Sequence, residues 1–186
     1  MTPYEHVVVV MSIIVGLAVT QLLKGVAQLY RTRKIVRTYW LHSAWVAVLV
    51  VFSFLLWWTF WNYRTIEDWN FFRFVLYLSP TIVFYLLTAI AFPDPSAAAA
   101  DLRDHYYSNR TGFFGTFALY GLLAGVTAIV VRGLPLQDLS NLFRLVMVGL
   151  LLVAMRSARE RVHAAVLVVC VALLLVYILS FQLRLA

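Results

Sequence analysis

The stretch TYWLHSAWVAVLVVFSFLLWWTFWNY, residues 38–63, decides the fold of this chain. It runs for 26 residues without an Asp, Glu, Lys or Arg, and a helix needs only about 20 apolar residues to cross a hydrocarbon core of roughly 30 Å. In lipid, only a helix or a closed barrel satisfies every backbone amide. Because the stretch is too long and too uniformly apolar for a barrel strand, it predicts a transmembrane helix.

The remainder of the chain has the same character. Of its 186 residues, 63% are apolar and 12% are charged, whereas soluble proteins average about 25% charged residues. No polar link is long enough to fold as a separate soluble domain. The sequence therefore predicts an all-α bundle of six transmembrane helices in a single integral membrane domain, residues 1–186, with spans near 5–30, 39–62, 71–92, 113–131, 139–155 and 163–183.

Basic residues flanking the spans predict the orientation, since Lys and Arg are retained on the cytoplasmic side. Ten of the 15 lie on one side and five on the other, which places both termini on the non-cytoplasmic side. The fifth span is the weakest prediction, because Arg144 leaves an uncharged run of only 11 residues behind it. We expect its guanidinium to reach the outer interface. Aromatic residues at the interfaces, including Trp40 and Trp45 on the inner side, are expected to act as anchors.

The charge of +7 does not indicate nucleic acid binding, because the basic residues sit at the ends of the spans, where insertion accounts for them. Membrane lipids are the expected contacts. The N-terminus lacks the basic residues and cleavage site of a secretory signal. A strong preference for Arg over Lys is typical of a GC-rich bacterial genome, so the predicted location is the bacterial inner membrane, as a multi-pass protein.

The first span carries a face of polar and small residues that should avoid lipid. At about 100° per residue, one half of the helix gathers a set that includes Ser12, Gly16, Thr20, Gln21 and Lys24. One hypothesis is close helix packing within a bundle or between copies, because small residues let helices approach. The other is the lining of a hydrophilic path. Gly121 and Gly125, spaced four apart in the fourth span, form a second motif suited to close packing.

Two local features predict bends or short elements. Pro80 should kink the third span and free a carbonyl, which is compatible with a hinge, an ion ligand or a bend satisfied by other donors. Between the third and fourth spans, Ser96 is expected to cap a short cytoplasmic helix that Gly112 ends.

Three histidines, His42, His105 and His163, are predicted to lie on the inner side, and Glu160 shares a helical face with His163. Such spacing is compatible with a metal, or with axial haem ligation by two of the histidines. No repeated histidine box or di-iron pattern accompanies them. We therefore predict no cofactor and keep a metal- or haem-binding enzyme as an alternative.

These observations predict a non-catalytic module of the inner membrane, either a homo-oligomer or an accessory subunit of a larger complex. No carboxylate lies deep in a span, and no nucleophile elbow or phosphate-binding glycine loop is present in the sequence, so an enzyme is the less expected class. A small channel or carrier that uses the polar face of the first span is the main alternative. Substrate, partner and oligomer number are not indicated.

Overall fold

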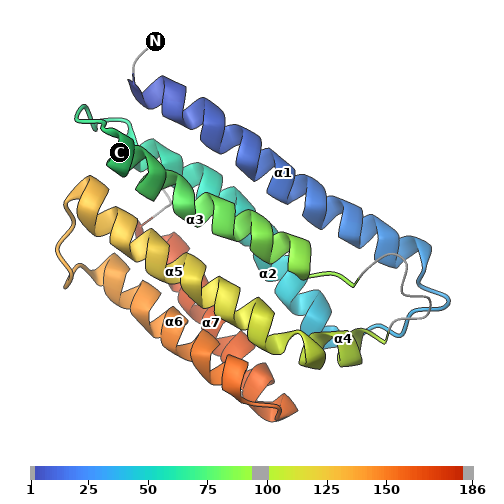
Figure 1. Ribbon diagram of the computed structural model, residues 1–186. Helices are drawn as coiled ribbons and strands as arrows, with labels where there is room; N and C mark the ends of the chain where they lie inside the picture. The colour runs from blue at the N-terminus through green and yellow to red at the C-terminus, as the bar shows by residue number, and fades with distance from the viewer. Residues whose placement is uncertain (1–2, 94–100, 182–186) are drawn as a thin grey trace.

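A computed structural model describes residues 3–93 and 101–181, and within them it is all-helical (Figure 1). Six of the helices are long and apolar enough to cross a membrane, including the fifth, which confirms the predicted class and span number. The elements are α1 (Pro3–Arg31), α2 (Trp40–Thr59) continued by the 3-10 turn η1 (Phe60–Tyr63), α3 (Phe71–Ile90), α4 (Leu102–Ser108), α5 (Arg110–Arg132), α6 (Leu139–Arg156) and α7 (Glu160–Phe181).

The six long helices form a ring. Their principal contacts run in the order α1, α3, α5, α6, α7, α2 and back to α1. The predicted hairpins are among these contacts, α1 with α2 and α6 with α7. We name the two ends of the ring by what they hold (Figure 1). The terminal end contains the start of α1, η1 and the connection between α5 and α6. The α4 end contains α4 and the connections from α1 to α2 and from α6 to α7.

The link into α5 differs from the prediction. The predicted cap, Ser96, lies outside the described residues, and the described helix α4 is capped by Asp101, whose Oδ1 accepts the Arg103 amide at 2.8 Å. Asn109 ends α4 and begins α5. The expectation that Gly112 ends the short helix is wrong, because Gly112 lies inside α5. A bend at Asn109, with φ −92° and ψ 1°, suffices to separate the two helices.

Aromatic side chains fill the centre of the ring toward the α4 end. Trp45 is 1% exposed and packs edge to face on Phe114, with ring centroids 5.3 Å apart. Phe113 and Phe117 surround it at 6.2 and 6.1 Å. Trp45 is therefore a core residue, and its expected role as an interfacial anchor is wrong. The sequence pattern does not distinguish Trp45 from Trp40, which lies on the same helix and is 53% exposed.

Candidate functional site

The polar face of α1 lies on the outside of the ring. The buried face of this helix is apolar, and it packs against α2 and α3 through residues spaced three or four apart: Val7, Met11, Val15, Ala18 and Leu22. On the opposite side Gly16, Thr20 and Lys24 are exposed, while Ser12 and Gln21 are partly exposed. Gly16, Thr20 and Lys24 thus face away from the other helices of the chain, and Ser12 and Gln21 lie at the two flanks of this surface.

The hydroxyl groups on this surface are hydrogen-bonded within α1. The Ser12 hydroxyl donates to the Val8 carbonyl and the Thr20 hydroxyl to the Gly16 carbonyl, each at 2.7 Å. Both hydroxyls are therefore satisfied within their own helix and tolerate apolar surroundings. A Cβ added at Gly16 would meet nothing within 4 Å. Gly16 is the floor of an open notch between Ser12 and Thr20, which we call the α1 notch.

The two glycines of the predicted packing motif in α5, Gly121 and Gly125, have different surroundings. A Cβ at Gly121 would lie 2.8 Å from Cγ2 of Val148, so α6 approaches α5 closely at this point. A Cβ at Gly125, one turn further along, would meet nothing within 4 Å. Of this pair, only Gly121 supports a close helix contact within the chain.

Pro80 lies inside α3, and the carbonyl that it deprives of a helical donor has other partners. The Leu76 carbonyl accepts the Thr127 hydroxyl of α5 at 3.0 Å and the Ser79 hydroxyl at 2.8 Å. These two hydrogen bonds account for the carbonyl without a bound ion, as expected for a bend satisfied by its neighbours. A hinge at Pro80 stays a prediction.

The predicted histidines gather at the α4 end, where His42 and His105 are neighbours and His163 has partners of its own. His163 is fully buried and uses both ring nitrogens. Its Nε2 donates to the Ser157 carbonyl at 2.9 Å, so its Nδ1 accepts the Tyr106 hydroxyl at 2.8 Å. His42 Nε2 donates to the Ala91 carbonyl at 2.9 Å. The His42 and His105 rings lie 6.0 Å apart, and burial lowers the pKa of His105.

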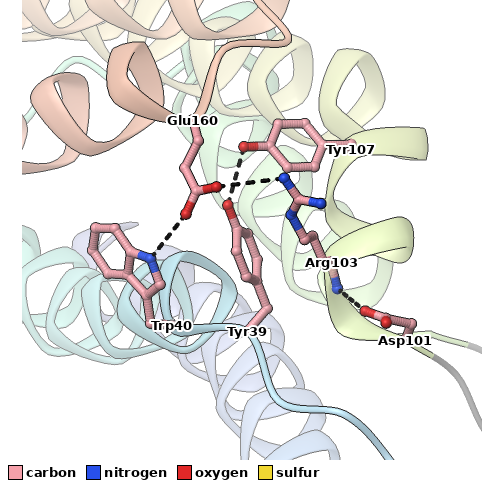
Figure 2. Close-up of polar contacts among 6 residues, drawn as sticks. All are labelled: Tyr39, Trp40, Asp101, Arg103, Tyr107 and Glu160. Atoms are coloured by element: carbon pink, nitrogen blue, oxygen red, sulfur yellow. Dashed lines mark hydrogen bonds and ion pairs between the residues drawn. The ribbon is translucent and has the colours of Figure 1, made fainter.

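Glu160 is the centre of a polar cluster that sequence analysis did not predict (Figure 2). Its carboxylate accepts the Trp40 indole N–H at 3.3 Å and lies 3.5 Å from the Arg103 guanidinium. Beside it, the Tyr39 and Tyr107 hydroxyls are 3.0 Å apart. The cluster ties α2, α4 and α7 together, so Glu160 is occupied by contacts within the protein. Nowhere in residues 3–93 and 101–181 do three His, Cys, Asp or Glu side chains gather as metal ligands.

The centre of the ring is hollow toward the terminal end, which the sequence did not indicate. A partly open cavity of about 130 Å³, which we call the central cavity, lies between η1 and helices α1, α2, α3, α5, α6 and α7. Its lining includes the polar residues Asn62, Tyr63, Tyr77, Thr127, Arg132, Arg144 and Tyr177. Phe52, Phe117, Leu151 and Leu174 supply much of its apolar wall.

Arg144 lines this cavity and is held by neutral groups. Its guanidinium donates to Asn141 Oδ1 at 2.7 Å, to the Ser140 hydroxyl at 3.2 Å and to the Tyr177 hydroxyl at 3.2 Å. The same Ser140 donates from its hydroxyl and its amide to Asp138, which caps α6. Those hydrogen bonds, together with the charges of Arg144 and Arg132, lower the pKa of Asp138. The fifth span thus carries its charge on an inward, hydrogen-bonded face.

Comparisons with known proteins do not assign this chain to a family. No protein-family model matches the chain, and neither the curated proteins nor the solved structures include a match to it.

Proposed function

We propose that this protein is a non-catalytic module of the bacterial inner membrane that pairs with a second copy of itself through the α1 notch. The observation that carries the proposal is the outward direction of the polar face of α1. Thr20 and Lys24 are exposed, together with apolar residues such as Ile13 and Leu17, on the side of α1 that does not pack inside the ring. Small residues on an exposed helix face let a neighbouring helix approach closely, which lipid chains do not require.

A second copy is the occupant that fits this face best. Two copies inserted in the same direction bring their α1 helices together in parallel, with Ser12, Gly16 and Thr20 at matching depths. Small residues four apart allow two such helices to approach closely and to gain van der Waals contact. The resulting interface is isologous, because the same surface serves both partners. A different membrane protein would need a complementary face of its own.

The alternative function, a small channel or carrier, is restricted to a path between copies of the protein. A path along Thr20, Gln21 and Lys24 cannot run through the inside of one ring, because these residues lie on its outer surface. It would have to run between copies.

We place the terminal end outside the cytoplasm, because ten of the 15 basic residues then lie on the cytoplasmic side.

The test uses two matched glycine variants. Gly16 and Gly149 are both exposed in spans, and an added Cβ at either one meets nothing within 4 Å, so Gly16→Leu and Gly149→Leu should both keep the fold of the single chain. Gly16→Leu fills the α1 notch, and Gly149→Leu adds the same bulk on α6. Light scattering in dodecyl maltoside should give a dimer for the wild type and for Gly149→Leu, and a monomer for Gly16→Leu.

Two results would defeat the proposal. One is a wild type that is monomeric both in mild detergent and in nanodiscs. The other is a Gly16→Leu variant that stays as dimeric as Gly149→Leu across a dilution series. Circular dichroism of both variants checks that their helix content is unchanged.

A further inference from the structure

We propose that the central cavity binds an anionic amphiphile, a molecule that joins a carboxylate or phosphate group to an apolar chain. The cavity lies within one chain, so this inference is independent of the pairing through α1. It rests on the distribution of polar groups along the cavity, on the surplus of positive charge there, and on a buried hydroxyl without a partner.

The cavity is polar near the terminal end and apolar deeper in the membrane. Arg132 is the last residue of α5, and Arg144 lies five residues beyond the start of α6, so both lie within about 8 Å of a helix end at roughly 1.5 Å per residue. Phe117, Leu151 and Leu174 line the cavity and are 2%, 2% and 7% exposed. A ligand with its charge at the interface and its chain in the hydrocarbon region matches this order.

The two arginines have donors to spare. Within the part of the chain that the structure describes, all hydrogen-bond acceptors of Arg144 are neutral. Among the described residues, Arg132 makes no hydrogen bond or ion pair, and its guanidinium lies over the Tyr63 ring at 5.6 Å. Asp138 is the carboxylate whose charge acts on both, and its Oδ1 already accepts two hydrogen bonds from Ser140. In the described ranges, the cavity lining holds these two guanidinium groups and no carboxylate, and Asp138 lies nearby. This surplus of positive charge attracts an oxyanion.

Tyr77 supplies the independent observation. This residue lines the cavity and is 3% exposed, and its hydroxyl is buried without a hydrogen-bond partner. A buried hydroxyl left in this way destabilises the protein unless another group pairs with it. Its ring centroid lies 4.4 Å from that of Tyr63, and the Arg132 guanidinium lies 5.6 Å from the centroid of the Tyr63 ring. Tyr77, Tyr63 and Arg132 therefore form one wall along which an oxyanion meets both a hydroxyl donor and a cation.

The size of the cavity sets which part of the ligand it encloses. At about 130 Å³ it approaches the volume of about 150 Å³ that holds a benzene molecule in a protein core. The enclosed part thus accommodates the acidic group and the first carbons of a chain. Because the cavity is partly open, the remainder of the chain can extend out of it.

The test compares ligands that share one chain and differ in the head. Purified protein in dodecyl maltoside is titrated with oleate, oleyl phosphate and oleyl alcohol, and binding is followed by native mass spectrometry. We expect at least one acid to bind about tenfold or more tightly than the alcohol, as loss of one charge-assisted hydrogen bond implies. A parallel sample from dioleoylphosphatidylglycerol nanodiscs shows whether a membrane phospholipid also stays bound to the protein. Equal binding of alcohol and acids would overturn the proposal.

Three variants locate the site. Arg132→Gln removes a cation from the cavity, and Arg73→Gln removes one at the same end of the bundle from a residue that does not line it. Arg132→Gln should weaken acid binding about tenfold or more, and Arg73→Gln should leave it unchanged. Tyr77→Phe should weaken acid binding while leaving the melting temperature of the ligand-free protein equal or higher. Equal effects of the two arginine variants, or a Tyr77→Phe variant that binds acids as the wild type does, would contradict the assignment.

Discussion

The hydrogen bond from Thr127 to the Leu76 carbonyl exists because Pro80 cannot supply the helical donor. The donor and acceptor are 3.0 Å apart, and Thr127 is 2% exposed. Hydrogen bonds between transmembrane helices contribute about 0.6 kcal/mol on average and at most about 1.7 kcal/mol. Because Ser79 continues to serve the carbonyl, we expect Thr127→Val to lower the free energy of unfolding by about 1 kcal/mol.

A double-mutant cycle isolates this coupling. In Pro80→Ala, residue 80 regains an amide that donates to the Leu76 carbonyl, so Thr127→Val should then cost only a few tenths of a kcal/mol. Unfolding in mixed micelles with increasing sodium dodecyl sulfate measures both costs. Thr88→Val is the control, because the Thr88 hydroxyl donates within its own helix, to Tyr85. If Thr127→Val costs the same with and without the proline, the explanation of this contact is wrong.

Three further predictions concern single positions. Gly121→Ala should destabilise the protein by about 1 kcal/mol, at the low end of overpacking costs, because its Cβ would lie 2.8 Å from Val148, whereas Gly125→Ala should be neutral or stabilising; thermal unfolding in detergent compares them. Asp138→Asn should lower stability at neutral pH, because hydrogen bonds from the following turn and nearby arginines lower the pKa of Asp138. That contribution is present above the ordinary pKa of 3.8 and is lost as pH falls through the lowered value, so the gap between the unfolding curves should close in acid. Glu160→Gln should change stability by less than about 1 kcal/mol, because its ion pair to α4 is exposed, and 1 M salt should remove the difference.

Each of the last three predictions would be contradicted by a specific result. Equal destabilisation by both α5 glycine variants would mean that α6 does not approach at Gly121. A difference at Asp138 that persists unchanged at pH 3 would mean that its ionised form is not what stabilises the cap. A large, salt-independent loss at Glu160 would mean that the cluster around it is structural rather than peripheral.

The spans were predictable because lipid demands a long uncharged helix for each crossing, and that demand is written in consecutive residues. Each predicted span agrees with a helix to within a few residues. Asn109 was missed as the joint of α4 and α5, since a bend with ordinary negative φ has no strong sequence signal. The glycine at position 112 suggested a helix end, but α5 continues through it.

The central cavity and the direction of the α1 face were not predictable in this way. The sequence separates the two sides of α1, but it does not say which side meets the other helices. In membranes, helices of one chain associate by shape and close contact, because lipid and leucine are equally apolar. Val7, Met11 and Ala18 fit α2 and α3, which leaves the notch at Gly16 outside. The cavity likewise depends on six helices meeting in one ring order, a property of no single span.

Disulfide cross-linking at position 16 in intact membranes tests the proposed pairing most directly. The native Cys170 is buried and is first replaced by alanine, after which Gly16→Cys and Val168→Cys are compared under mild oxidation. Val168 is 66% exposed on α7 and serves as the control. Pairing through α1 predicts a covalent dimer for Gly16→Cys and none for Val168→Cys. No cross-link at position 16, or equal cross-linking at both positions, would contradict it.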